Sequence, residues 1–148
     1  MFAKRRFTTL IAALTVGVTA LVASPTPAHA SDTVVNVAAV HAGGAGATAA
    51  RATATLTWLN RSVRIDNVKL YCAGHHKCQL FIFGDQGNTT VDFTEFGEVI
   101  SYGSTPITFD YGDKMLDGSA VRGGITEVRV YVHDNTHSPL YGLQTLYR

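Results

Sequence analysis

The chain has 148 residues, enough for one domain, and two of them are cysteines. It carries 12 Lys and Arg against 11 Asp and Glu; without Lys4, Arg5 and Arg6 of an N-terminal leader, 9 remain against 11, a formal charge of −2. A mildly acidic domain without a basic cluster argues against nucleic acids and membrane surfaces as partners, because both attract Lys and Arg patches.

Residues 1–30 have the pattern of a secretory signal peptide. Residues 4–6 are basic, residues 10–23 are almost uniformly apolar, and residues 28–30 have the small-x-small form after which signal peptidases cut. The apolar run is shorter than the roughly 20 residues that span a bilayer, which argues against a membrane anchor. The sequence therefore predicts a secreted, extracellular protein that begins near Ser31.

Residues 31–50 are expected to form a first short strand followed by a connector. Residues 31–40 are apolar and β-branched, as in a strand. Residues 41–50 contain three glycines and five alanines, which offer little side chain to anchor the chain. This composition predicts a flexible Gly/Ala-rich connector.

Residues 51–148 are expected to form the domain itself, and its first strands are the clearest. Residues 51–59 alternate threonine with small or apolar side chains, the period of a half-buried strand, which places Trp58 in the core. The apolar positions then change phase at Asp66 and Asn67. This change predicts a β-bulge or a tight bend.

Cys72 and Cys78 flank a short polar loop between two apolar, β-rich runs. Two cysteines in a secreted chain indicate one disulfide, because a redox motif would need Cys-x-x-Cys and a zinc site two further ligands. We predict a disulfide that ties the mouth of a β-hairpin over residues 68–83. The chain-entropy model gives a ring this small about 2 kcal/mol of stabilisation.

The second half of the chain predicts further short strands separated by turns. Residues 80–83 are apolar without alternation, which indicates a central strand covered on both faces. In the next strand Val91 and Phe93 are expected to face inward. A turn is expected at residues 85–88, strands over residues 89–96, 98–102, 107–111, 125–133 and 140–148, and a long loop over residues 112–124.

Eight or nine short strands at this spacing, with no segment that keeps a helical period, indicate an all-β fold. We predict a small antiparallel β-sandwich, with a small closed β-barrel as the alternative.

Two tyrosines are candidate contacts for a carbohydrate ligand. Tyr71 and Tyr131 fall on the strand face opposite the aliphatic residues, next to Lys69 and Arg129. An exposed aromatic ring packs well against the apolar face of a sugar.

The loop at residues 73–77 is a second candidate site, because it combines His75, His76 and Lys77 between the two cysteines. A loop held by a disulfide loses less entropy when it binds a partner. The loop is therefore a candidate contact for an extracellular protein. An exposed polar tip that only ends the strands is the alternative interpretation.

Two further clusters contain residue types that bind metals, but their spacing does not fit a metal site. The spacing of His133 and His137 would suit zinc if both lay on one face of a helix, but the residues between them predict a loop. Asp110, Asp113 and Asp117 do not match the Asp-x-Asp-x-Asp-Gly spacing of a calcium loop. No metal or other cofactor is expected.

Catalytic motifs are also missing from the sequence. It contains no Gly-x-Ser-x-Gly, no His-Glu-x-x-His and no phosphate-binding glycine loop. Asp92, Glu95 and Glu98 could supply the carboxylate pair of a glycosidase, but they are expected on one edge strand and its turn.

Two functions remain, and neither is enzymatic. The sequence favours a secreted cell-wall or carbohydrate-binding module that uses Tyr71 and Tyr131. The alternative is an extracellular inhibitor or toxin-like protein that presents residues 73–77 to a protein partner. The sequence specifies neither the ligand nor the oligomeric state.

Overall fold

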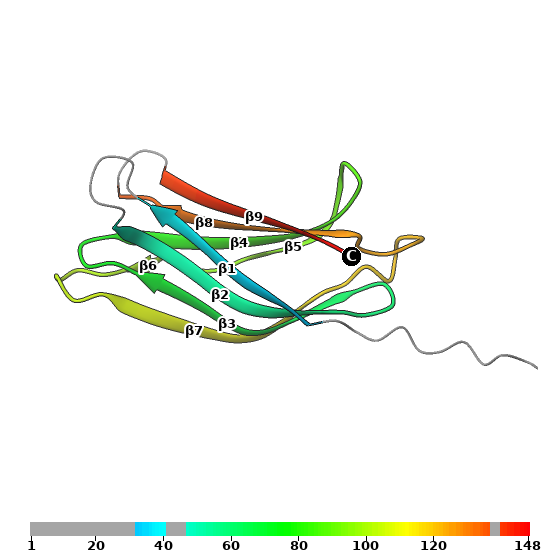
Figure 1. Ribbon diagram of the computed structural model, residues 1–148, viewed down its shortest axis with the longest axis horizontal. Coiled ribbons are helices and arrows are strands. Elements are labelled where there is room, and N and C mark those ends of the chain that lie inside the picture. Colours follow the sequence, from blue (N-terminus) through cyan, green and yellow to red (C-terminus); the bar gives the residue numbers. More distant parts are fainter. Residues whose placement is uncertain (1–31, 41–46, 137–139) are drawn as a thin grey trace, which may run out of the picture.

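The computed structural model describes residues 32–40, 47–136 and 140–148, which form two antiparallel β-sheets packed face to face (Figure 1). The predicted signal peptide and most of the predicted connector lie outside these ranges. Sheet A has the strand order β1-β2-β3-β7. Its strands are β1 (Asp32–Val40), β2 (Thr48–Trp58), β3 (Val63–Cys72) and β7 (Ile107–Leu116).

Sheet B has the order β5-β4-β8-β9, and a short strand, β6, pairs with the start of β4. Its strands are β4 (Lys77–Gln86), β5 (Thr89–Glu95), β6 (Val99–Ile100), β8 (Glu127–Asp134) and β9 (Leu140–Tyr147). The two sheets do not close into a barrel. The predicted all-β antiparallel sandwich is therefore confirmed, and the barrel alternative is wrong.

The core follows from alternation, because each strand places every second side chain between the sheets. Trp58 is only 8% exposed, so its predicted core position is confirmed. The largest fully buried apolar side chains come from both sheets and from the segment before β8: Val35, Leu56, Val63, Ile65, Val68, Leu70, Leu80, Ile82, Leu116, Ile125, Val128 and Val130. Within the described ranges no helix is long and apolar enough to cross a membrane.

The predicted bulge lies where the apolar phase changes. Asn67 has a φ of 56°, and the pairing of β3 with β7 shifts register between Ile65 and Val68. This left-handed residue moves the inward positions of β3 from odd to even numbers, so that both Ile65 and Val68 reach the core.

The Cys72–Cys78 disulfide is confirmed, with the two Cα atoms 5.7 Å apart, but its setting differs from a hairpin. The strands on either side of it belong to different sheets, since β3 pairs with β2 and β7 whereas β4 pairs with β5, β6 and β8. Both cysteines are buried between the sheets. The disulfide therefore ties sheet A to sheet B at one end of the sandwich.

Several strand boundaries differ from the sequence-based expectation. β4 continues to Gln86, inside the turn predicted at residues 85–88. β2 begins at Thr48, inside the predicted connector, and β6 covers only two residues. β7 continues to Leu116, although Gly112 was expected to begin a loop. The strand accommodates this glycine, which has a φ of 68°, by a bulge that leaves Tyr111 as the extra residue opposite β3.

The sandwich is nearly closed along one edge, where β9 lies beside β1 (Figure 1). The backbone N–H of Asn36 donates to Gln144 Oε1 at 3.0 Å. Gly142 approaches Ala38 so closely that a Cβ atom would lie 2.2 Å from its carbonyl oxygen. A glycine is therefore required at position 142 for the two sheets to meet.

Candidate binding face on sheet B

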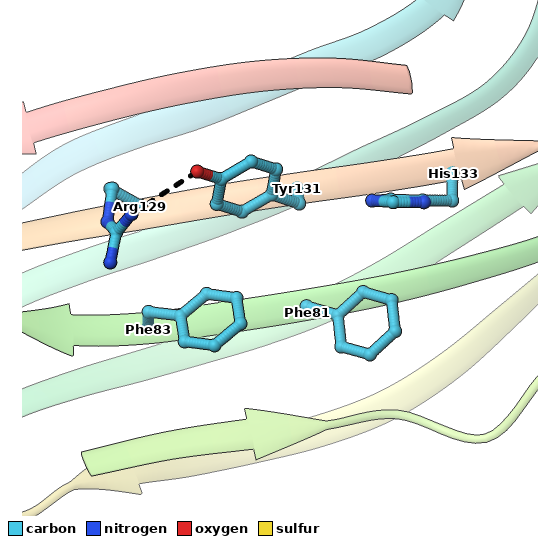
Figure 2. Close-up of a pocket in the computed structure, with 5 residues that line it drawn as sticks. All are labelled: Phe81, Phe83, Arg129, Tyr131 and His133. Atoms are coloured by element: carbon cyan, nitrogen blue, oxygen red, sulfur yellow. Dashed lines mark hydrogen bonds between the residues drawn. The ribbon is translucent and has the colours of Figure 1, made fainter. Parts of the chain in front are cut away.

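The outer face of sheet B carries aromatic side chains from neighbouring strands. Leu80 and Ile82 of β4 face the core, so Phe81 and Phe83 point away from it. On β8 the same alternation turns Tyr131 outward, opposite Phe81 in the strand pairing. Figure 2 shows these side chains on one side of the two strands.

The rings contact one another across four strands. Phe83 and Tyr131 meet edge to face with their centroids 5.6 Å apart, and Phe81 and His133 do so at 5.3 Å. Phe93 of β5 stacks on Phe83 at 6.0 Å, and Tyr141 of β9 lies 6.0 Å from His133. We call this layer the aromatic face: Phe81, Phe83, Phe93, Tyr131, His133 and Tyr141.

The centre of the aromatic face is hollowed. A shallow depression of about 330 Å³ is lined by Phe81, Phe83, Arg129, Tyr131 and His133. At its sides Phe93 and Tyr141 are 58% and 59% exposed, and the neighbouring Leu143 is 47% exposed. Contiguous exposed apolar surfaces are often interaction sites, so the aromatic face is a candidate binding site.

Two sequence-based expectations about these strands are wrong. Residues 80–83 are covered on the core side only, and Phe93 faces outward instead of inward. The physical reason is the number of layers: a two-layer sandwich leaves every strand with one face in water, so an uninterrupted apolar run must expose half of its side chains.

One charged pair lies at the end of the depression. Arg129 donates from Nε to Asp85 Oδ2 at 2.7 Å and from Nη2 to Oδ1 at 3.0 Å, the two-pronged geometry of a strong ion pair. Asp85 is only 1% exposed, and its Oδ1 also accepts from the hydroxyl of Thr90 at 2.8 Å. The carboxylate therefore holds the guanidinium in one orientation.

The pair also changes the acidity of both groups. Burial would raise the pKa of Asp85, but the hydrogen bonds from Arg129 and Thr90 and the positive charge outweigh it and lower that pKa. The hydrogen bond to Asp85 raises the pKa of Arg129 further. Both groups are thus charged at neutral pH.

The guanidinium of Arg129 extends over the aromatic rings. It lies 5.5 Å from the ring centre of Phe83 and 5.9 Å from that of Tyr131, within the range of cation–π attraction. Its Nη1 donates to the Tyr131 hydroxyl at 3.3 Å.

His133 lies in the same depression. Burial of its imidazole ring lowers the pKa of His133, which favours the uncharged form at neutral pH.

The structure does not bring the two candidate tyrosines together. Tyr71 lies on the outer face of sheet A, because its neighbours Leu70 and Cys72 face the core. The Arg51 guanidinium lies 5.6 Å from the Tyr71 ring centre. The full thickness of the sandwich separates Tyr71 from Tyr131.

The loop at residues 73–77 is packed against neighbouring segments. The N–H of His75, which has a φ of 63°, donates to the Gly103 carbonyl at 2.8 Å. His76 Nδ1 lies 2.9 Å from Oδ2 of the buried Asp134. The side chains of His75 and Lys77 remain exposed.

Asp134 is held as a carboxylate despite its burial. Burial would raise its pKa, but hydrogen bonds from Thr136 and His76 outweigh this effect and lower the pKa. The backbone N–H of Thr136 donates to Asp134 Oδ1 at 3.0 Å. This carboxylate therefore fixes one end of the loop at residues 73–77.

The metal candidates of the sequence make other contacts. Asp110 Oδ1 accepts from the N–H of Gly112, Asp113 Oδ1 from that of Asn67, and Asp117 Oδ1 from that of Ser119. His137 lies outside the described ranges. Across the part of the chain that the structure describes, no three His, Cys, Asp or Glu side chains come together as a metal site would require.

The three carboxylates weighed as glycosidase groups also accept hydrogen bonds from neighbouring groups. Asp92 accepts from the N–H of Asp117, Glu95 from the Gln79 amide and Glu98 from the Asn135 amide.

Comparisons with known proteins add no family: no family model matches the chain, and no match was found among the curated proteins or the solved structures.

Of the residues on the aromatic face, sequence reasoning identified Tyr131 and missed the rest. A usable signal was present in the run at residues 80–83, whose two phenylalanines both occupy odd positions. In β8, Arg129, Tyr131 and His133 share the face opposite the valines. The contact of Asp85 with Arg129 has no local signal, because 44 residues separate them.

Proposed function

We propose that this protein is an extracellular, non-enzymatic binding protein whose aromatic face binds a polysaccharide, such as that of a cell wall. The main support for this proposal is the continuous layer of aromatic rings around the depression. Sugar rings present apolar C–H faces that pack against exposed aromatic rings, with a few polar groups fixing their orientation. Tyr131 and Arg129 offer such groups beside the rings.

The extracellular part of the proposal has two supports. The disulfide is compatible with an extracellular location, because such bonds persist in oxidising environments. The second support is the predicted signal peptide at residues 1–30.

A protein partner at residues 73–77 is the second candidate. It is favoured by the exposed side chains of His75 and Lys77 on a loop fixed by the disulfide. Two side chains offer little contact area, however, and His76 already contacts Asp134. The aromatic face offers a larger and more apolar surface, so we favour the polysaccharide.

The experiment is a pull-down of the purified protein on insoluble cellulose, chitin and peptidoglycan, comparing bound and free fractions. We expect retention on at least one polymer and its loss in Tyr131→Ala. Tyr71→Ala is the matched control, because it removes the same half-exposed side chain from the opposite sheet. Thermal melts of both variants verify folding.

Two results would contradict the proposal. Wild-type protein that stays in solution with all three polymers leaves the aromatic face without its proposed ligand. Equal retention of wild type and a folded Tyr131→Ala would place binding elsewhere.

A further inference from the structure

We infer that the aromatic face selects uncharged polysaccharides, and that Arg129, positioned by Asp85, selects them by donating hydrogen bonds to hydroxyl or amide oxygens of the sugar. This inference rests on the proposed function, because it specifies the ligand of the same face.

The first observation is charge balance. Arg129 is the only formally charged side chain among the five that line the depression, and its charge is compensated by the buried carboxylate of Asp85. A second carboxylate, Glu127, lies 3.9 Å from Arg129 Nε. An anionic polymer would therefore meet two carboxylates close to the one cation and would gain little net attraction.

The second observation is the number of donors that Arg129 still offers. A guanidinium has five N–H groups. Two are used by Asp85 and one by the Tyr131 hydroxyl. Among the residues that the structure describes, none accepts a hydrogen bond from the second N–H of Nη1 or of Nη2, so both can donate to a ligand that lies on the rings.

The third observation is that these donors are fixed before a ligand arrives. Asp85 and the two flanking rings hold the guanidinium plane, and Thr90 in turn holds Asp85. A pre-oriented donor loses little entropy on binding and favours acceptors at defined positions. Paired to a carboxylate, it acts as a directional donor with little net charge, which suits neutral oxygens.

The test uses soluble polymers that share a backbone and differ in charge. Hydroxyethylcellulose is compared with carboxymethylcellulose, and glycol chitin with carboxymethyl chitin, by measuring dissociation constants at low and high salt. We expect the neutral member of a pair to bind about tenfold more tightly, a difference of about 1.4 kcal/mol, with little dependence on salt.

Variants of Arg129 and Asp85 test whether this pair determines the preference for the neutral polymer. Asp85→Asn leaves the Arg129 charge without its buried partner, so preference should shift toward the anionic polymer and binding should become sensitive to salt. Arg129→Gln should weaken binding of the neutral polymer about tenfold without any gain for the anionic one. Asp66→Asn, which removes the partner of Arg64 on sheet A, is the matched control and should change neither.

The outcomes distinguish the two proposals. Equal or tighter binding of the anionic polymer by wild type overturns the inference while the proposed function stands. An unchanged preference in folded Asp85→Asn, or in Arg129→Gln if Asp85→Asn does not fold, also overturns it. Binding to no soluble or insoluble polymer contradicts the proposed function itself.

Discussion

The outer faces of the two sheets are built by the same alternation and differ in what they expose. Sheet A presents mostly threonines and charged side chains to water, among them Arg51, Thr53 and Lys69. Val34 and Met115 are also exposed on this face, but they form no layer of aromatic rings. Sheet B presents the aromatic face. The side chains that face inward are similarly aliphatic in both sheets. The fold therefore depends on the inward-facing side chains of each strand, and the proposed binding depends on the outward-facing side chains of sheet B.

Among the described residues, each outer face also carries an Arg–Asp pair, and the two pairs differ in burial and in the number of hydrogen bonds. On sheet A, Arg64 contacts Asp66 at 2.8 Å with side chains 50% and 22% exposed. On sheet B, Arg129 contacts Asp85 at 2.7 Å with side chains 34% and 2% exposed. The same chemistry is therefore a solvated surface contact on one face and a fixed element of a candidate site on the other.

The largest expected effect is the loss of stability when Asp85 is removed, compared with the removal of Asp66. Asp85→Ala should lower the free energy of unfolding by about 3 kcal/mol, because it leaves the partly buried Arg129 without its carboxylate. Asp66→Ala should change it by less than about 0.5 kcal/mol, because an exposed pair contributes little. Urea denaturation of both variants measures the difference, and equal losses would show that burial does not distinguish the pairs.

The sequence predicts those features of the two sheets that are determined within a single strand. Alternation identified the strand positions that carry Trp58 and Tyr131, and the phase change identified the bulge at Asn67, since each signal lies within one strand. The placement of β3 and β4 in different sheets depends on pairings with strands far along the chain. No local pattern specifies them.

The candidate site was less predictable for the same reason. That Phe81 and Phe83 face water follows only once the fold is known to have two layers. The contact between Asp85 and Arg129 depends on the register of β4 with β8, which pairs Asp85 with Glu127 and Phe83 with Arg129. A short sequence window contains neither fact.

The next effect in size concerns the bond that ties the two sheets together. Replacing both cysteines, Cys72→Ala with Cys78→Ala, should lower the free energy of unfolding by about 2 kcal/mol, because the unfolded chain loses a constraint. Binding to the polysaccharide should persist, since the pairing of β4 with β8 holds the aromatic face. Urea denaturation and the pull-down measure the two quantities.

An outcome in which binding disappears while the double variant remains folded would contradict this separation. It would show that the end of the sandwich near Cys78 takes part in binding, and it would favour the loop at residues 73–77 over the aromatic face.

The smallest expected effect is a pH dependence that originates on sheet B. Burial lowers the pKa of His133 below its usual 6.5, so the unfolded chain binds this proton at a higher pH than the folded chain. Stability should therefore fall as the pH drops through 6.5 toward the folded pKa. Asp85 and Asp134, whose pKa values are lowered, should add a second loss below about pH 4.

His133→Gln separates these two pH ranges, because glutamine retains a polar side chain and does not titrate. Melting temperatures between pH 7.5 and 3 should show a weaker decline above pH 5 in this variant and an unchanged decline below pH 4. If wild type and His133→Gln decline equally above pH 5, the imidazole is as well solvated in the folded chain as in the unfolded one. The centre of the aromatic face would then be open to water, which would weaken the contrast with sheet A.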